Sequence, residues 1–465
     1  MVGYASHRLQ HSRVNNDKLR RRTTPLTAPL RVGLAGLGTV GAGVVALLDA
    51  NAGLIERRAD RAIVVTAVSA RDRGRDRGVD LSRAAWVDDA TQLSARDDVD
   101  VVVEMIGGSD GPALVLARAT LERGKAFVTA NKAMLAHHGL ELAALAEAKG
   151  VALKYEAAVA GGIPVIKALR DGAAANRILR VYGILNGTCN YILTRMEAEG
   201  LSFAAVLADA QAKGFAEADP SFDVDGIDAA HKLSILAGIA FGARIDFASV
   251  AAQGIRAVAA VDLAHAATLG FRIKLVALAE EIDGTLFQRV HPCLVPLAHP
   301  LAHVDGALNA VVAEGDFAGR LFFSGAGAGA GPTASAVVAD LIDVARGEVG
   351  PAFAMPTARL AALGVADAAA ATGRCYLRLT VVDRPGVLAE LTATLRDAGV
   401  SIESLIQRSP ANGGGNSETT AAADVYVVMV THAVRQSAVA AALARMATSA
   451  SVTAPPMMMH ILDYG

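Results

Sequence analysis

The sequence predicts an α/β protein with a doubly wound parallel sheet, a following α+β domain and a small βαβ-type module at the C-terminal end. Three observations indicate this fold class. Continuous apolar segments of strand length alternate with helical segments over residues 30–166, as buried parallel strands do. Residues 165–331 mix helical and strand patterns. A strand–turn–helix–strand order returns after residue 374, and 465 residues are enough for two or three domains.

The elements of the first domain are predicted in chain order. Residues 30–50 form a strand, a glycine turn and a helix, and residues 62–78 form a strand that ends in an arginine-rich loop. The next strands fall at 99–108, 126–132 and 151–166, the last running into a glycine loop, with helices at 113–124 and 134–150 between them. Farther on, residues 358–373 read as an alanine-rich linker or connecting helix, and residues 411–423 as a flexible loop before a strand at 424–434.

Composition narrows the class of protein. Hydrophobic residues make up 53% of the chain and charged residues 19%, which implies large buried cores. No apolar run approaches the roughly 20 residues of a membrane-spanning helix. The net charge of −2 gives no general attraction to nucleic acid or an anionic membrane. Because Cys189, Cys293 and Cys375 are scattered, we expect a cytoplasmic protein without a disulfide framework or zinc site.

The first 29 residues differ from the rest of the chain. Arg8, Arg13, Lys18 and the arginine run at 20–22 face a single acid, Asp17. No apolar core of a secretory signal accompanies them. We therefore expect a disordered basic leader, with a basic targeting sequence as the alternative.

A glycine turn follows the first predicted strand and opens the first helix. It places Gly36, Gly38 and Gly41 in the order G-x-G-x-x-G. The first glycine permits a tight turn, the second lets the backbone approach a pyrophosphate, and the third lets the helix pack closely on the sheet. Because the helix N-terminus also offers N–H groups to phosphates, we predict dinucleotide binding by a Rossmann-type domain.

The end of the second strand bears on which dinucleotide binds. An acid there suits the ribose 2′-hydroxyl group of NAD, whereas an arginine suits the 2′-phosphate group of NADP. Arg71 precedes Asp72 at this point, so the sequence favours NADP without excluding NAD. Solvated loop charges with no binding role are the alternative.

Acids crowd the start of an apolar helix at 232–243. Asp228 and Lys232 are four residues apart, on one helical face and in the favourable order for an ion pair. The helix is apolar almost all round, and a partly buried lysine with a carboxylate partner suits proton transfer. Four loop acids precede it and are candidates for capping the helix or holding a substrate ammonium group: Glu217, Asp219, Asp223 and Asp225. A calcium loop is disfavoured, because the EF-hand spacing and its terminal Glu are absent.

Six motifs occur in the order found in homoserine dehydrogenases, so the chain resembles that family from about Arg31 to its C-terminus. They are GLGTVG, TANK, YEAAVAGGIPVI, NGTCNYIL, GFAEADPSFDVDGIDAAHKLSILA and GAGAGAGPTASAVVADL. The resemblance implies reversible NAD(P)H-dependent reduction of L-aspartate 4-semialdehyde to L-homoserine, on the route to threonine, methionine and isoleucine. It also implies a Rossmann domain at 30–155 with a return segment at about 325–350, a catalytic and dimerisation domain at 156–324, and an ACT regulatory domain at 374–465.

The resemblance assigns roles to single residues. Lys232 and Lys132 of TANK would be the catalytic lysines, since a carbonyl reduction needs a positioned acid at the oxygen. Asp228 would orient or tune the site. Glu217, Asp223 and Lys132 would bind the substrate, and Glu217 would hold the amino group of the substrate. The implied cofactor positions are Gly36, Leu37, Gly38, Thr39, Val40, Gly41, Arg71, Gly107, Asn131, Lys132, Gly327 and Gly329.

A monovalent cation, sodium, is also implied by the resemblance. The matching positions in YEAAVAGGIPVI are Glu156, Val159, Gly161 and Ile163. From the residues alone, a plain strand end is the alternative. In NGTCNYIL, Cys189 stands where many relatives carry threonine. Because reduction of a free aldehyde needs no covalent intermediate, we interpret Cys189 as a packed or backbone-supporting residue.

The C-terminal module resembles an ACT domain. Asp383, Arg384, Pro385 and Gly386 match its strand-to-helix turn. The resemblance implies feedback inhibition by L-threonine and a homo-oligomer, dimer or tetramer, with oligomerisation alone as the alternative role. The chain upstream of the glycine turn leaves no room for an aspartokinase domain, so we expect a monofunctional enzyme.

Two other functions are alternatives to homoserine dehydrogenase activity. An aspartate-semialdehyde dehydrogenase needs a cysteine nucleophile, and no cysteine here stands beside a convincing base. A non-catalytic amino-acid sensor that binds a dinucleotide would leave the two lysines and the acid cluster without a role.

Overall fold

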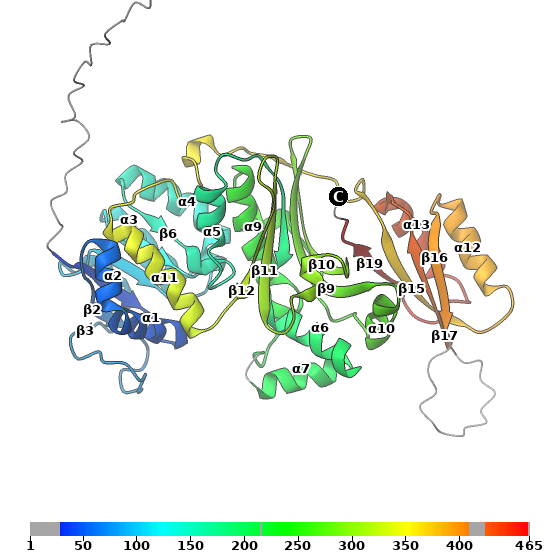
Figure 1. Ribbon diagram of the computed structural model, residues 1–465, viewed down its shortest axis with the longest axis horizontal. Coiled ribbons are helices and arrows are strands. Elements are labelled where there is room, and N and C mark those ends of the chain that lie inside the picture. Colours follow the sequence, from blue (N-terminus) through cyan, green and yellow to red (C-terminus); the bar gives the residue numbers. More distant parts are fainter. Residues whose placement is uncertain (1–27, 214–215, 409–423, 464–465) are drawn as a thin grey trace, which may run out of the picture.

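The structure is a computed structural model that describes residues 28–213, 216–408 and 424–463. Its three parts follow one another along the long axis (Figure 1). Most of the expected basic leader and the glycine-rich loop at 411–423 lie outside the described residues. Among those described, no single helix has the length and apolar character to cross a membrane, although one bent helix pair, Thr39–Ala50 with Ala52–Ala59, passes by length and composition alone.

The first part is the parallel sheet that the sequence predicts. In the described chain its strand order is β3-β2-β1-β4-β5-β6, the order of a Rossmann fold, and every neighbouring pair is parallel. The strands are β1 (Leu30–Ala35), β2 (Ile63–Ser69), β3 (Ala85–Trp86), β4 (Val101–Glu104), β5 (Ala126–Thr129) and β6 (Leu153–Lys154). The helices are α1 (Thr39–Ala50), α2 (Ala52–Ala59), α3 (Pro112–Glu122) and α4 (Lys132–Lys149).

Both faces of this sheet are covered, which explains its continuous apolar strands. In β4, Val102 packs into the core that contains the α3 and α4 side chains, while Val101 and Val103 pack into the core beneath α1. A helix from much later in the chain, α11 (Ala330–Ala345), completes the second core beside α1 (Figure 1). The return of α11 brings the glycine segment before it back to the first part.

The second part is an antiparallel sheet with strand order β12-β11-β7-β9-β10. Its strands are β7 (Ile178–Ile184), β9 (Phe271–Ile282), β10 (Thr285–Pro296), β11 (Leu308–Gly315) and β12 (Gly319–Ala326). The associated helices are α5 (Val165–Lys167), α6 (Gly187–Glu199), α7 (Phe203–Ala212), α8 (Ser221–Val224), α9 (Ile227–Phe241) and α10 (Ala260–Thr268). Helix α9 is buried from Asp228 to Ile239, because it lies between this sheet and α4 of the first part.

The third part continues the same sheet through the C-terminal strand. Here the strand order is β19-β15-β17-β16, and β19 also pairs in parallel with β10. The elements are β15 (Cys375–Val382), α12 (Val387–Asp397), β16 (Ile402–Arg408), β17 (Asp424–Thr431), α13 (Gln436–Met446) and β19 (Met457–Ile461). Short strands complete the sheets: β8 (Ala251–Ala252) and β13 (Gly364–Val365) pair with β10, and β14 (Thr372–Gly373) pairs with β18 (Val434–Arg435).

Three sequence predictions change in the structure. The connecting-helix alternative for 358–373 is wrong: the segment is a linker with a short 3-10 turn (Thr357–Arg359) and the short strands β13 and β14. The strand predicted from residue 151 ends at Lys154, because the chain turns into a 3-10 helix at Glu156–Ala158. The sequence reading of the C-terminal module also missed α13 and β19.

Candidate active site

The glycine turn forms a tight bend between β1 and α1. Gly36 has a φ of +101°, and a Cβ atom there would lie 2.6 Å from the carbonyl oxygen of Met105. A Cβ atom on Gly41 would lie 2.0 Å from the carbonyl oxygen of Gly36. In contrast, within the described parts of the chain a Cβ atom on Gly38 would have nothing within 4 Å, and no side chain caps α1. The open space at this helix N-terminus fits a pyrophosphate group.

The buried carboxylate of Glu104 organises the ends of β4 and β5. It accepts hydrogen bonds from the N–H groups of Ile106 (2.6 Å) and Gly107 (2.9 Å) and from the hydroxyl group of Thr129 (2.6 Å). Nearby, Asn131 donates to the carbonyl oxygen of Gly108 (2.7 Å) and caps α4. Two predicted cofactor residues, Gly107 and Asn131, are thus fixed at the carboxyl ends of the strands, where doubly wound sheets bind ligands.

The loop after β2 is basic and lies against the glycine turn. Arg71 is exposed, and the guanidinium groups of Arg73 and Arg77 lie 5.8 and 5.5 Å from the ring centre of Trp86. Arg77 also donates to the carbonyl oxygen of Leu37 (3.1 Å). Positive charge therefore flanks the predicted dinucleotide site.

A pocket of about 600 Å³ brings together residues of the first and second parts. It contains many of the predicted site residues, at the point where α4, α9 and the glycine segment before α11 meet. Its polar or glycine lining includes Lys132, Gly161, Asn186, Thr188, Asp223, Asp228, Lys232, Asn309, Gly327, Gly329 and Thr333, and Val40 of the glycine turn also reaches it.

Asp228 joins the two predicted catalytic lysines. Its Oδ2 accepts a hydrogen bond from Lys232 Nζ (2.6 Å), and its Oδ1 lies 3.1 Å from Lys132 Nζ. The Asp228 carboxyl is 4% exposed, and burial opposes its charge. The two ammonium groups and a hydrogen bond from Asn186 outweigh that burial and hold the pKa of Asp228 well below its usual range.

Among the described residues, Lys232 has two hydrogen-bond acceptors, and it is 9% exposed. Besides Asp228, it donates to the carbonyl oxygen of Leu185 (2.7 Å). An ammonium group has three N–H bonds, so one remains for a ligand in the pocket. Lys132 is the first residue of α4, and its Nζ lies 5.7 Å from the ring centre of Phe222. Its side chain is more exposed than that of Lys232.

The remaining predicted acids are divided between pocket and surface. Asp223 lines the pocket and accepts hydrogen bonds from Asn186 (2.7 Å) and Thr188 (3.2 Å). Asp225 pairs with Arg256 (2.5 Å), and Asp219 accepts the N–H of Ser221 (3.1 Å). Glu217 is exposed and does not line the pocket.

Cys189 is packed in the interior and supports the backbone, as interpreted from the sequence. It is fully buried, and its thiol group donates to the carbonyl oxygen of Asp223 (3.2 Å). Burial, reinforced by the charges of Asp223 and Asp228, raises the pKa of the Cys189 thiol well above its ordinary value. A thiolate nucleophile is therefore disfavoured at this position.

Two asparagines of the pocket were missed by the sequence reading. Asn186 bridges Asp223 and Asp228, and an asparagine directly before a helical segment is an N-cap signal that could have drawn attention to it. Asn309 donates to the carbonyl oxygen of Leu185 (3.1 Å), beside Lys232. Its Oδ1 is buried and has no partner among the described residues, which suits an N–H donor of a bound ligand. Nothing in the local sequence marks Asn309.

The predicted cation loop is a sharp turn with left-handed residues at Ala160 and Gly161 (φ +57° and +55°). The carboxylate oxygens of Glu156 accept the N–H groups of Ile166 (2.9 Å) and Lys167 (3.0 Å). Burial, together with the charge of Asp340, raises the pKa of Glu156 to about 7. In the described chain no backbone N–H group donates to the carbonyl oxygens of Val159 or Gly161, whereas that of Ile163 accepts the N–H of Val165.

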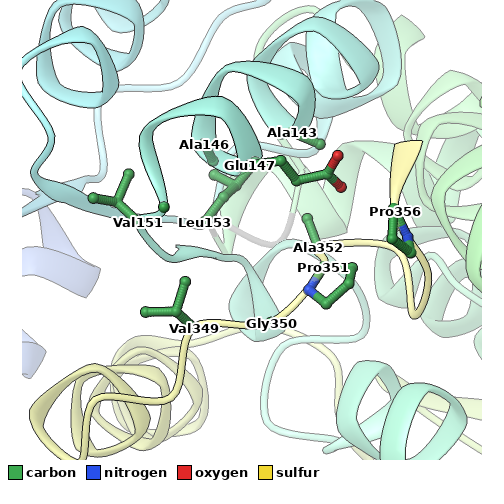
Figure 2. Close-up of a pocket in the computed structure, with 11 residues that line it drawn as sticks. Ala143, Ala146, Glu147, Val151, Leu153, Val349, Gly350, Pro351, Ala352 and Pro356 are labelled. Carbon is green, nitrogen blue, oxygen red and sulfur yellow. The ribbon is translucent and has the colours of Figure 1, made fainter. Parts of the chain in front are cut away.

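A second pocket, of about 260 Å³, lies between the end of α4 and the segment at 349–356 (Figure 2). Its lining is mainly aliphatic. Its one carboxylate, Glu147, accepts hydrogen bonds from the N–H group (3.0 Å) and hydroxyl group (2.7 Å) of Thr357. Because that carboxylate is engaged, the chemistry is better placed at the lysine-lined pocket. Within the described residues, no group of three or more His, Cys, Asp or Glu side chains is arranged to hold a metal ion.

A Rossmann sheet whose ligand-binding edge faces a lysine–carboxylate–lysine group defines a nicotinamide-dependent oxidoreductase. Comparison with protein families gives the particular family. The chain matches the homoserine dehydrogenase NAD-binding domain over residues 36–156, the homoserine dehydrogenase domain over residues 164–342 and the ACT domain over residues 376–446.

Known proteins agree with this result. The chain is 43% identical to homoserine dehydrogenase of Neisseria gonorrhoeae, over 93% of this chain and 98% of that one. It is 42% identical to homoserine dehydrogenase of Pseudomonas aeruginosa, over 93% and 99%. A crystal structure of a homoserine dehydrogenase from Thiobacillus denitrificans superposes with a TM-score of 0.87 at 41% identity, covering 94% of this chain and 99% of that one. The chain belongs to the homoserine dehydrogenase family and is an oxidoreductase that acts on a CH–OH group.

Proposed function

We propose that the protein catalyses the reversible NAD(P)H-dependent reduction of L-aspartate 4-semialdehyde to L-homoserine. The observation that carries this proposal is the Lys132–Asp228–Lys232 group, which lies in a pocket shared with the glycine turn and the glycine segment before α11. When bound, NAD(P)H supplies the hydride that adds to the aldehyde carbon. The rest of the reaction is proton transfer and charge stabilisation, which this chain's side chains perform.

Lys232 is the proposed proton donor. Its free N–H polarises the aldehyde oxygen, and as the hydride reaches the carbon, the oxygen takes this proton and becomes the hydroxyl group of homoserine. Asp228 holds the ammonium group in place and stabilises its charge before transfer. In the reverse direction, neutral Lys232 removes the hydroxyl proton while the hydride leaves.

Lys132, Asp223 and Glu217 are proposed to bind the substrate. Lys132 places a second positive charge beside the reacting oxygen. The substrate's α-ammonium group needs a carboxylate, which Asp223 offers from within the pocket and which the exposed Glu217 is proposed to offer in the complex. In the proposed complex, Glu217 folds towards the pocket when the substrate binds.

NADP is the proposed cofactor in preference to NAD. The exposed guanidinium group of Arg71 and its neighbours Arg73 and Arg77 supply positive charge after β2, which suits a 2′-phosphate group. Gly36, Gly38 and Gly41 would hold the pyrophosphate group. The other residues proposed to contact the cofactor are Leu37, Thr39, Val40, Gly107, Asn131, Lys132, Gly327 and Gly329.

A monovalent cation, sodium, is proposed for the loop at 156–163. The carbonyl oxygens of Val159 and Gly161, which accept no backbone N–H group from the described residues, support it, because hard cations prefer oxygen ligands. Glu156 and Ile163 are the remaining positions. The Glu156 carboxylate is committed to two N–H groups, so its backbone carbonyl is the better candidate ligand.

The pathway and regulation are proposed with the reaction. We place the enzyme in the cytoplasm, in the biosynthesis of threonine, methionine and isoleucine, as a homo-oligomer. The ACT module is proposed to bind L-threonine as a feedback inhibitor. Adding threonine to the assay is expected to lower the rate of NADP⁺ reduction. An unchanged rate would indicate that the module serves oligomerisation alone.

The test of the reaction is a spectrophotometric assay of homoserine-dependent NADP⁺ reduction, repeated with NAD⁺. We expect absorbance of the reduced cofactor to rise only when homoserine is present, with a lower KM for NADP⁺ than for NAD⁺. Oxidation of NADPH that depends on an added acyl phosphate would instead support an aspartate-semialdehyde dehydrogenase. Cofactor binding without any turnover would support the sensor.

A further inference from the structure

Asn186 occupies the space between the two acids of the pocket. It is 3% exposed and lies at the N-cap position of α6. Its Nδ2 donates to Asp223 Oδ1 (2.7 Å) and to Asp228 Oδ2 (2.9 Å), while its Oδ1 accepts the N–H of Cys189 (2.8 Å). Both donors of the amide are therefore used, and each reaches a different carboxylate.

Two carboxylates that flank one nitrogen repel each other when both are charged. A side-chain amide is neutral and donates to both at once. With Asn186 in place, Asp228 keeps Oδ1 for Lys132 and shares Oδ2 between Lys232 and Asn186. Among the described residues, the ion pairs of both lysines go to Asp228, and Asp223 is held by Asn186 and Thr188 instead.

We propose that Asn186 is a positioning residue that keeps Asp228 as the shared partner of both lysines and so directs the third N–H of Lys232 at the substrate oxygen. This inference rests on the proposed reduction. Asn186 acts through Asp228 and Asp223 and need not touch the reacting atoms. Its second role, as the cap of α6, makes a test necessary that separates positioning from capping.

The Asn186→Asp variant provides that test. It keeps the shape and the acceptor for the Cys189 N–H, but a charged carboxylate replaces both donors and competes with Asp228 for the lysines. At pH 9 we expect kcat to fall about 10- to 100-fold, the scale of lost hydrogen bonds to charged groups. When protonated, the new carboxyl donates its O–H to one of the two acids. The deficit relative to the unaltered enzyme should therefore shrink as the pH falls towards 6.

If Asn186 only capped the helix, the kcat deficit of Asn186→Asp would change with pH in the opposite direction. A charged carboxylate caps a helix N-terminus better than a neutral one, so the deficit would then grow as the pH falls. A deficit that grows or stays constant with falling pH, or full activity at pH 9, overturns the inference. The matched control is Asn190→Asp on the same helix, because Asn190 holds the carbonyl oxygens of Val304 and Leu308 rather than the pocket acids. Its kcat ratio should not improve at low pH.

A second variant covers the case in which Asn186→Asp does not fold. Asn186→Ser keeps a cap but cannot donate to two acids, and circular dichroism checks its fold. We expect a kcat about tenfold lower or worse, with NADPH binding measured by fluorescence unchanged; an unchanged kcat overturns the inference. The proposed function fails separately, if the unaltered enzyme does not reduce NADP⁺ with homoserine.

Discussion

At the residue scale, the charged start of α9 serves two different purposes. Asp225 and Asp219 make surface contacts, whereas Asp228 enters the protein with Lys232 and is stabilised there by two ammonium groups and an amide. The site thus combines a buried carboxylate with a lowered pKa and a lysine that directs one N–H into the pocket. The acids of this segment therefore look alike in sequence and differ in burial.

Replacing the proposed proton donor is the direct test at this scale. We expect Lys232→Ala to lower kcat by about 10²- to 10⁴-fold, the usual contribution of general acid catalysis, and to leave NADPH binding largely intact. Steady-state kinetics and NADPH fluorescence titration measure the two effects. Lys213→Ala is the control, because Lys213 forms an exposed ion pair with Asp209 on the same i,i+4 spacing. Near-normal turnover of the Lys232 variant would disprove the assigned role.

The sequence predicted part of this site and not the rest, for a physical reason. The Asp228–Lys232 pair follows from helical spacing, and the family motifs assign Lys132 to the same site, whereas its contact with Asp228 appears only in the structure. Asn186 and Asn309 reach the same point from α6 and β11, at separations of 42 residues from Asp228 and 124 residues from Leu185. Contacts of this kind depend on how the elements pack, which local patterns do not encode.

At the element scale, the alternation of apolar strands and helices predicted the first sheet because its strands are buried on both faces. The short C-terminal strand β19 was not predicted. It is stabilised by pairing with β10 and β15, which lie much earlier in the chain, rather than by its own pattern. The 358–373 linker shows the converse: its alanines favour a helix, but Leu360 is buried in the core and the short strands β13 and β14 pair with β10 and β18 instead.

The glycine turn gives the prediction at this scale, because two of its glycines have different surroundings. Gly38→Ala should change the free energy of unfolding by less than about 0.5 kcal/mol, since its φ of −74° suits alanine and the space is open. The added methyl group should weaken NADPH binding at least about tenfold, because the backbone no longer approaches the pyrophosphate. Urea denaturation and fluorescence titration measure the two quantities.

Gly41→Ala is the matched comparison. Its Cβ would meet the carbonyl oxygen of Gly36 at 2.0 Å, so the helix must move away from the strand, at a cost of about 1–3 kcal/mol. Stability should fall in this variant. Equal effects of the two substitutions on both measurements would contradict the separate roles of the glycines.

At the scale of the whole molecule, two of the features that join the catalytic part to the ACT part are a shared sheet and a buried carboxylate. Strand β19 makes their sheets continuous, and the fully buried Asp262 of α10 binds two side chains of β15. Asp262 accepts hydrogen bonds from the Tyr376 hydroxyl group (2.9 Å) and the Arg378 guanidinium group (2.6 Å). Helix α10 also packs on α6, whose N-cap residue is Asn186 of the pocket. This joint is therefore linked to the pocket through α10 and α6.

Removing the Asp262 carboxylate should loosen this joint. We expect Asp262→Ala to destabilise the protein by about 3–5 kcal/mol, because it leaves the largely buried Arg378 guanidinium group without its carboxylate partner. Denaturant unfolding measures the loss. The control is Glu403→Ala, which breaks the half-exposed Arg374–Glu403 pair of the same domain and should cost less than about 1 kcal/mol. Similar losses in both variants would show that the joint carries no special stability.

The joint also contains neutral histidines, which make stability depend on pH. His460 of β19 accepts a hydrogen bond from Arg289 (2.8 Å) and lies beside His291 of β10 and the thiol of Cys375. Burial, together with the charge of Arg289, lowers the pKa of His460 to about 3. The unfolded chain therefore takes up a proton near pH 6.5 that the folded chain refuses. This contribution to stability is complete above pH 6.5 and is lost as the pH falls towards 3.

We expect one such histidine to remove about 1.5 kcal/mol of stability between pH 6.5 and pH 5. His460→Gln keeps an acceptor for Arg289 but does not titrate, so its stability should fall less steeply over this interval. Denaturant unfolding at several pH values measures the slope. His303→Gln, at an exposed histidine outside the joint, should leave the slope of the unaltered protein unchanged. If the His460 variant and the unaltered protein lose stability in parallel, the acid sensitivity arises elsewhere and the sheet joint is not where the protein first responds to acid.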